Sequence, residues 1–278
     1  MIIDTHCHIY HSEMENAEEI IKEAAKNDMH LILNGTDPQS NEEILKLAEK
    51  YENVHAALGY FHTLADDVSE EDIVLLDEQL ENDNVIAVGE IGIDYYNGKE
   101  NRKKQMELFE KMLILAEKHD LPVIVHSRKA MQDTYDILKK HAVVGSMHSY
   151  QGSPEMAENF IRLGFYIGIG GTITHRNNKK AGRTLNRIGI EHALLETDSP
   201  YMPPEEKRGE ANTSLNLKYI IGKIAQELDI EEEEVIKTTT ENAKRLFGIW
   251  YFSINKFKRL KFKKRTDQIK KYYKNSII

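Results

Sequence analysis

The sequence predicts an α/β protein with the architecture of a (β/α)8 barrel. Short apolar runs rich in β-branched residues alternate with longer amphipathic segments, a pattern typical of parallel βαβ units. Eight such units follow one another, and the length of 278 residues is close to that of a single α/β barrel. A doubly wound parallel sheet is the alternative, because strands are easily miscounted in a single sequence.

The predicted strands are the apolar runs. The first is MIID at the N-terminus, and VIAVGEIG, PVIVHS and FYIGIGG are later examples. In chain order, we place the eight strands at residues 1–4, 30–36, 54–60, 85–92, 122–127, 143–149, 165–171 and 192–200.

The segments between the strands read as amphipathic helices, as in NAEEIIKEAAKND and SNEEILKLAEKY. No low-complexity linker interrupts residues 1–248, so we expect this part to form one domain. In chain order, we place the helices at residues 16–28, 40–51, 70–82, 100–119, 129–140, 153–163, 176–187, 213–229 and 231–246.

The composition is that of a soluble globular protein, with 40% apolar and 30% charged residues. No stretch approaches the roughly 18 apolar residues of a membrane span, and the N-terminus lacks the pattern of a secretory signal. The single cysteine, Cys7, cannot form an internal disulfide, which fits a reducing cytoplasm. We therefore expect a cytoplasmic protein without a membrane span.

The charge is unevenly distributed. Residues 249–278, the basic tail, contain ten Lys or Arg and one acid, so they carry +9. Because the whole chain carries −9, residues 1–248 carry −18. An acidic body argues against a protein that coats DNA nonspecifically. The basic residues of the tail are interleaved with Tyr and Phe, a composition that suits single-stranded nucleic acid, a membrane surface or a solvated extension.

Potential metal ligands stand at the ends of the predicted strands. His6 and His8 lie two apart and would project to the same side of an extended strand. In a barrel, the C-terminal strand ends converge on one mouth, so ligands from distant parts of the chain would become neighbours. The full set is His6, His8, Glu90, His126, His148 and Asp198.

Four imidazoles and two carboxylates suit a divalent ion such as Zn²⁺ or Mn²⁺, and Mg²⁺ less well because of the nitrogen ligands. Six ligands are more than one tetrahedral zinc requires. Two ions that share Glu90 would use all six, and such a pair can activate water for phosphoryl transfer.

These motifs resemble the TatD-type metal-dependent deoxyribonucleases, within the amidohydrolase-like barrels. The resemblance covers about residues 1–248 and runs through DTHCH, GEIGIDY, PVIVHSR, HSYQGSPEMAENFIRLGFYIGIGG, LLETDSPYMPP and TTENAKRLFG. It implies a (β/α)8 barrel that holds one or two divalent metals and hydrolyses DNA phosphodiesters, as an exonuclease in some members.

The resemblance also implies roles for the ligands. His6 and His8 would hold the first metal, His126 and His148 the second, and Glu90 would bridge them. Asp198 would bind the first metal and take the proton from the attacking water. Asp198 and Glu90 are therefore the expected catalytic residues.

Two motifs depart from those of many relatives. GYFHTLADD replaces a Gly-x-His-Pro stretch, so that Phe61 stands in the histidine's place and His62 follows it. RGEANTS keeps Arg208, Gly209 and Asn212 of a longer conserved motif but lacks its second arginine. Substrate specificity therefore does not carry over from the family as directly as the metal site does. The candidate substrate-binding residues are His62, Arg128, Tyr201, Arg208 and Asn212.

Two residues close to the ligands receive separate predictions. Glu196 precedes Asp198 by two, so it would face the barrel interior, either to orient a ligand histidine or to pair with a buried cation. Cys7, between His6 and His8, would point into the core.

Three hypotheses for the function follow. The first is a metal-dependent deoxyribonuclease with DNA as its substrate. The second keeps the metal site but hydrolyses a small amide, ester or lactone. The third is a nucleic-acid-binding protein that acts through the basic tail, although a pure binder would not need six metal ligands.

Overall fold

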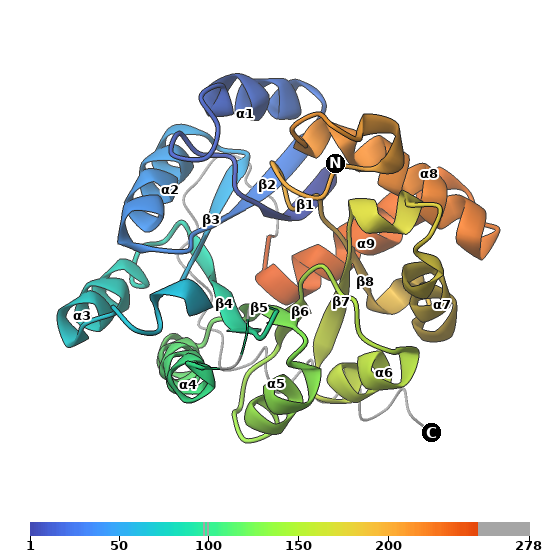
Figure 1. Cartoon of the computed structure of the whole chain (residues 1–278). Helices are drawn as coiled ribbons and strands as arrows, with labels where there is room; N and C mark the ends of the chain where they lie inside the picture. Colours follow the sequence, from blue (N-terminus) through green and yellow to red (C-terminus); the bar gives the residue numbers. More distant parts are fainter. Residues whose placement is uncertain (97, 99, 250–278) are drawn as a thin grey trace.

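The computed structural model describes residues 1–96, 98 and 100–249. Eight parallel strands pair in chain order from β1 to β8 and form the central barrel of Figure 1, with helices around it. A parallel bridge between Cys7 and Ser199 brings the two edges of the sheet together. The (β/α)8 prediction is confirmed. The strands are β1 (Ile2–Cys7), β2 (Met29–Asn34), β3 (Val54–Leu58), β4 (Val85–Asp94), β5 (Val123–Arg128), β6 (Gly145–Met147), β7 (Phe165–Ile169) and β8 (Ala193–Leu195).

Each strand is followed by a helix that packs on the outside of the barrel, and a further helix follows the last of these. These helices are α1 (Ala17–Lys26), α2 (Pro38–Lys50), α3 (Glu70–Gln79), α4 (Arg102–His119), α5 (Met131–Leu138), α6 (Pro154–Arg162), α7 (Lys179–Ile188), α8 (Leu217–Leu228) and α9 (Glu232–Phe247). Short 3₁₀ helices lie at His62–Leu64 (η1), Gly171–Thr174 (η2), Ile190–His192 (η3), Glu205–Lys207 (η4) and Ser214–Asn216 (η5).

The strands are apolar because both of their faces are covered. Every residue of β3 and β7 is buried, as expected of a parallel strand that packs against helices on one face and the barrel interior on the other. The main differences from prediction are at element ends. Strand β8 stops at Leu195, short of the predicted 200. Helix α7 starts three residues later than predicted, and α8 starts four residues later because η5 occupies Ser214–Asn216.

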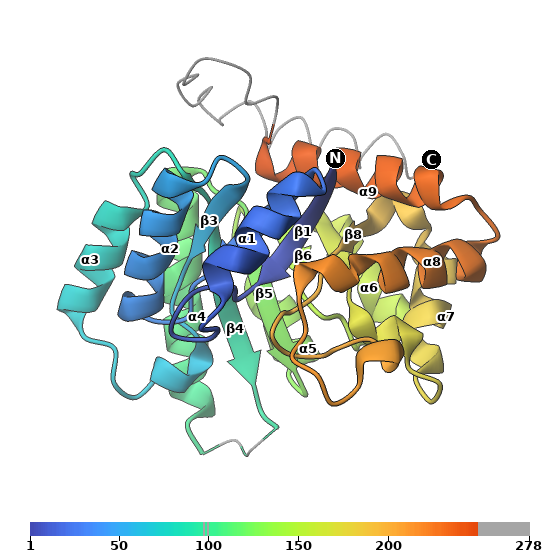
Figure 2. The ribbon, with the colours of Figure 1, turned by 90° about the horizontal axis from the view of Figure 1, so that it is seen from above.

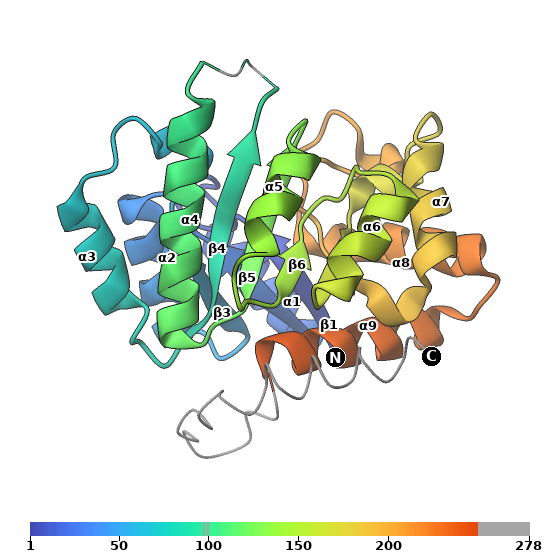
Figure 3. The same ribbon diagram turned by 90° about the horizontal axis from the view of Figure 1, so that it is seen from below.

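Helix α9 lies across the end of the barrel at which the strands begin (Figures 2 and 3). The Thr240 hydroxyl donates to the carbonyl oxygen of Met1 at 3.2 Å. The Asn242 amide donates to the carbonyl oxygens of Ile190 and Ala193 at 3.0 and 2.9 Å. Since this end is covered, the mouth for chemistry is the opposite end, where the strands finish.

Register shifts lie next to the first predicted ligands, in β1 and in β4. In β1, Asp4 pairs with Leu31 and Cys7 with Leu33, so β1 has one residue more than β2 over this stretch. In β4, Val88 pairs with Val123 and Ile91 with Val125, again with one extra residue. Such bulges re-aim the side chains beside them, and here they flank His6 and Glu90.

Gly92, just after the second bulge, allows β4 to approach β5 closely. Its φ is +145°, and a Cβ built on it would lie only 2.0 Å from the carbonyl oxygen of His126. Only glycine fits this position without displacing the backbone of a predicted ligand.

The basic tail lies outside the described residues apart from Ile249, so its predicted role stays a prediction. Within the described part of the chain, no helix combines the length and apolar character that crossing a membrane requires.

Candidate metal centre

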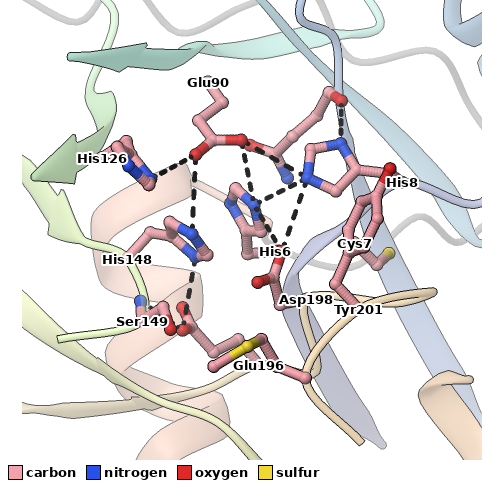
Figure 4. A network of polar contacts seen from close by, with 12 residues as sticks. His6, Cys7, His8, Glu90, His126, His148, Ser149, Glu196, Asp198 and Tyr201 are labelled. Atoms are coloured by element: carbon pink, nitrogen blue, oxygen red, sulfur yellow. Dashed lines mark hydrogen bonds and ion pairs between the residues drawn. The ribbon is translucent and has the colours of Figure 1, made fainter. Parts of the chain in front are cut away.

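The six predicted ligands converge at the mouth of the barrel, as Figure 4 shows. His6, Glu90 and His126 come from β1, β4 and β5, whereas His8, His148 and Asp198 follow β1, β6 and β8. Among the residues that the structure describes, four groups of three potential ligands lie close enough together to hold a metal ion, and three of these groups consist entirely of predicted ligands.

One donor set combines two imidazole nitrogens with one oxygen from each of two carboxylates. The Nε2 atoms of His6 and His8 are 3.1 Å apart. They lie 3.5 and 3.4 Å from Oε2 of Glu90, and both lie 3.6 Å from Oδ1 of Asp198. Donors placed tetrahedrally at about 2.0–2.1 Å from zinc are about 3.3–3.4 Å apart. The two imidazole nitrogens are therefore spaced from each other and from each carboxylate oxygen about as ligands of a single ion would be.

The other donor set uses the second oxygen of the same carboxylate. Oε1 of Glu90 lies 3.0 Å from Nδ1 of His126 and 3.5 Å from Nε2 of His148. Glu90 thus presents one oxygen to each donor set, as a carboxylate that bridges two metal ions would. The residues present fit one or two divalent ions.

Hydrogen bonds on the far side of two imidazoles favour this ligand geometry. Nδ1 of His8 lies 2.8 Å from the carbonyl oxygen of Asn34, and since a carbonyl only accepts, His8 donates there and keeps a lone pair on Nε2. Nε2 of His126 lies 3.0 Å from Oδ2 of Asp94, which leaves Nδ1 to face Glu90. Such outer partners orient metal-binding histidines.

Asp94 is a site residue that the sequence analysis missed. It lies four residues after Glu90 in GEIGIDY, so its place in that motif was the available signal. The same oxygen of Asp94 that contacts His126 also lies 3.8 Å from Nε2 of His62.

Glu196 contacts the His148 side of the site. Its Oε1 is 3.4 Å from Nδ1 of His148 and accepts a hydrogen bond from the backbone N–H of Ser149 at 2.5 Å. Glu196 was predicted either to orient a ligand histidine or to pair with a buried cation. In the structure it contacts His148, which is one of the predicted ligand histidines.

A second residue missed from sequence, Asp4, ties β1 to the loop after β8. Its buried carboxylate accepts hydrogen bonds from the N–H and hydroxyl of Thr197 at 2.9 and 2.6 Å and from Ser214 at 2.6 Å. Burial raises the pKa of Asp4 to about 7, although these hydrogen bonds lower it. The N–H of Asp198 donates to the carbonyl oxygen of His6 at 2.9 Å, so the same junction sets the distance between two ligands.

The site keeps its carboxylates ionised. Burial alone would raise the pKa of Glu90, but the imidazoles of His148 and His6 outweigh it, and the pKa lies well below its usual value. Burial alone would also raise the pKa of Asp198. The imidazoles of His148 and His8 outweigh this effect, so the pKa of Asp198 is lowered as well. Two ionised carboxylates in a buried site create a strong preference for cations.

Three candidate substrate-binding residues lie around the site. The ring centroid of His62 is 5.8 Å from that of His126, and the Tyr201 ring is 6.0 Å from that of His8. The Tyr201 hydroxyl donates to Glu13 at 2.5 Å. The Arg128 guanidinium is 3.5 Å from the ring centroid of Tyr96, a tyrosine that is 52% exposed.

The remaining candidates lie in the loop after β8. Nε of Arg208 is 3.1 Å from Oε2 of Glu205, and its side chain is 61% exposed. Asn212, predicted to bind substrate, is instead fully buried, and its amide donates to the carbonyl oxygens of Thr197 and Tyr201. We therefore assign Asn212 to loop support. Cys7 is buried in the core, as predicted.

Comparison with known proteins decides the family. The family model described as TatD related DNase matches residues 3–248. The chain belongs to the TatD-related DNase family. A metal-dependent hydrolase of Bacillus subtilis, YabD, is 35% identical over 254 residues, which are 90% of this chain and 100% of that protein. The Escherichia coli hydrolase YjjV is 32% identical and covers 89% of this chain and 98% of its own.

Solved structures of TatD-family proteins share the fold. The crystal structure of the TatD homologue YjjV from Escherichia coli has a TM-score of 0.83 at 30% identity, covering 90% of this chain and 98% of that one. A TatD-family hydrolase from Entamoeba histolytica has a TM-score of 0.78 at 20% identity, covering 88% of this chain and 97% of that one. The present chain is thus a metal-dependent hydrolase of the TatD family.

Proposed function

We propose that this TatD-family hydrolase cleaves phosphodiester bonds of DNA, as an exonuclease, with divalent ions bound at the barrel mouth. The observation that carries the proposal is the arrangement of Glu90, whose two oxygens face two donor sets at 3.0–3.5 Å. Paired divalent ions are a recurrent means of hydrolysing phosphodiesters, and the family model is described as a DNase.

The two donor sets define which residues would hold the ions. His6, His8 and Asp198 would serve one ion, His126 and His148 the other, and Glu90 both. When bound, Zn²⁺, Mn²⁺ or Mg²⁺ would lower the pKa of water and neutralise charge that develops on the phosphoryl oxygens. The nitrogen-rich donors favour Zn²⁺ or Mn²⁺.

Asp198 is the proposed proton acceptor. Its side chain is 15% exposed, against 5% for Glu90, so it is the carboxylate more open to the mouth, where water and substrate enter. Its lowered pKa keeps it ionised near neutral pH, which a general base requires. Glu90, buried between four imidazoles, is suited to hold the ions in place.

Exposed groups around the centre are proposed to bind DNA. Tyr96 and Tyr201 are 52% and 49% exposed and offer faces on which bases can stack. Arg128, beside Tyr96, can donate two hydrogen bonds to a phosphate. His62 and Arg208 are further contacts for the substrate. A cytoplasmic location and contact of nucleic acid with the basic tail complete the proposal.

The test uses end-labelled single-stranded DNA and metal-stripped protein, with Zn²⁺, Mn²⁺ or Mg²⁺ added back singly. We expect stepwise shortening that requires metal and is lost in a folded Asp198→Asn variant. A Glu71→Gln variant, changed at an exposed position of α3, is the matched control and should retain activity. Absence of cleavage by protein with bound metal would reject DNA as the substrate and direct the search to esters, amides and lactones.

A further inference from the structure

A basic pocket lies between α7 and α8, away from the metal ligands. It has a volume of about 590 Å³ and is bounded by the loop after β7 and the facing sides of the two helices. Four of its lining residues are cationic at neutral pH and one is acidic: Arg176, Lys179, Arg183, Lys223 and Glu227. This positive charge stands out because residues 1–248 carry −18 in total.

Two of the cations in this pocket are available to a ligand. Lys223 lies 2.7 Å from Glu227, and Arg176 lies 3.9 Å from Glu205, so these charges are compensated within the protein. Lys179 and Arg183 form no ion pair with any of the residues that the structure describes. Both lie on α7, whose sequence KKAGRTLNRI has four basic residues and no acid. Like charges collected on one helix face destabilise it unless an anion neutralises them.

One end of the pocket lies at the same end of the barrel as the metal centre. Its wall begins at Ile173 in η2, directly after the C-terminal end of β7. A Cβ built on Gly170 would lie 3.6 Å from Cγ of Glu196, the residue that contacts His148. Thr174 in the pocket wall comes four positions after Gly170, so the two lie at most about 14 Å apart.

We propose that this α7–α8 pocket binds the phosphodiester backbone of a nucleic-acid strand, several nucleotides from the bond at the metal centre. Lys179 and Arg183 are the contacting cations, and Asn178 and Asn186 on the same wall supply neutral polar groups. The proposal rests on the proposed function, because a phosphodiester at the metals continues as a chain of regularly spaced phosphates. A nucleic-acid strand bound at the metal centre is long enough for its next phosphates to reach the α7–α8 pocket. A small amide or ester is too short to do so.

The experiment measures binding rather than cleavage. Fluorescence anisotropy would follow labelled oligothymidylates of 2, 4, 8 and 12 nucleotides added to full-length protein over a range of salt concentrations. The pocket variant is Lys179→Gln/Arg183→Gln. The matched control is Lys22→Gln/Lys46→Gln, which removes the same charge from exposed positions on α1 and α2. Circular dichroism and thermal melting would establish that both variants are folded.

We expect the pocket variant to bind the long oligonucleotides on the order of tenfold more weakly than wild type at moderate salt, with the control unchanged. Loss of two phosphate contacts should reduce the slope of log K against log salt by about 1.4 for a single strand. The shortest oligonucleotide should bind both proteins alike.

Equal affinities and equal salt slopes for the pocket variant and wild type would overturn the proposal, as would an equal loss in the control. Neither result depends on hydrolysis, so either would leave the proposed nuclease function standing. Conversely, a wild-type protein that binds long strands through the pocket but never cleaves them would refute the nuclease function alone.

Discussion

Oε1 of Glu90 lies 3.0 Å from Nδ1 of His126, and this contact turns the carboxylate so that its other oxygen faces His6 and His8. A single side chain thereby joins two donor sets. The consequences of this arrangement can be measured by metal content, without knowledge of the substrate.

Replacing Glu90 with Gln should reduce metal binding from two ions per chain to at most one. The amide has a single acceptor oxygen, and its NH₂ group is a donor that cannot bind a cation. The measurement is elemental analysis of purified protein after incubation with Zn²⁺ or Mn²⁺. The Glu71→Gln variant should match wild type, and two ions retained by Glu90→Gln would show that Glu90 does not bridge.

Asp94 should affect the affinity of the His126 side of the site only. Removing its carboxylate in Asp94→Ala frees the imidazole of His126 to rotate, so the affinity for one ion should fall by about 10–100-fold. Asp94→Asn keeps an acceptor oxygen at the same place and should recover part of this loss. Isothermal titration with each variant separates the two ions, and unchanged affinities in Asp94→Ala would show that Asp94 does not position His126.

Removing metal should lower the thermal stability of the protein. Each ion that binds only the folded state stabilises it by about 2.7 kcal/mol when present at 100 times its Kd. For a barrel of this size, this corresponds to a fall in Tm of about 5–11 °C for each ion removed. Differential scanning calorimetry with and without chelator measures the change. A His8→Ala variant should show a smaller difference than wild type, and an equal difference would place the bound metal elsewhere.

The stability of the metal-free protein should decrease as pH falls, in part because of His55. His55 is buried, and burial together with the neighbouring His30 lowers its pKa to about 3, against 6.5 for an ordinary histidine. Between these two values the unfolded chain binds a proton at this residue that the folded protein does not. The free energy of unfolding should therefore fall by about 1.4 kcal/mol for each pH unit below 6.5.

Urea unfolding of wild type and His55→Gln at several pH values between 7.5 and 5 tests this contribution. The difference between the two proteins cancels the titrating groups that do not contact His55, including the predicted metal ligands, and leaves His55 together with its neighbour His30. The variant should be the less sensitive to acid, and parallel pH profiles would show that His55 does not contribute.

Much of the fold and of the metal centre could be predicted because both depend on chain direction. Parallel strands joined by helices all end on the same side, so polar residues at strand ends meet wherever a barrel forms. His126 and His148, 22 residues apart, are predicted neighbours for this reason alone. The bounds of short strands such as β8 were less accurate, because tertiary contacts end them and local propensity does not.

The residues that orient the ligands were harder to find. The carbonyl oxygen of Asn34, which fixes the tautomer of His8, belongs to the backbone, and no residue pattern identifies it. Asp4 bonds to Thr197, 193 residues away, and only the closed barrel brings the two together. The prediction that Asn212 binds substrate was based on its place in a polar loop. In the structure its side chain is buried and holds the loop through hydrogen bonds to backbone carbonyl oxygens.

The sequence by itself therefore determined the barrel, and it identified the six side chains that meet at the C-terminal ends of the strands. Only the tertiary structure decided which carboxylate oxygen faces which imidazole nitrogen, since that depends on the register between neighbouring strands. The extra residues between Asp4 and Cys7 and between Val88 and Ile91 shift that register in β1 and β4, which carry His6 and Glu90. A strand alternates its side chains with a period of two whatever its partner does, so its own sequence holds no record of where the partner lies.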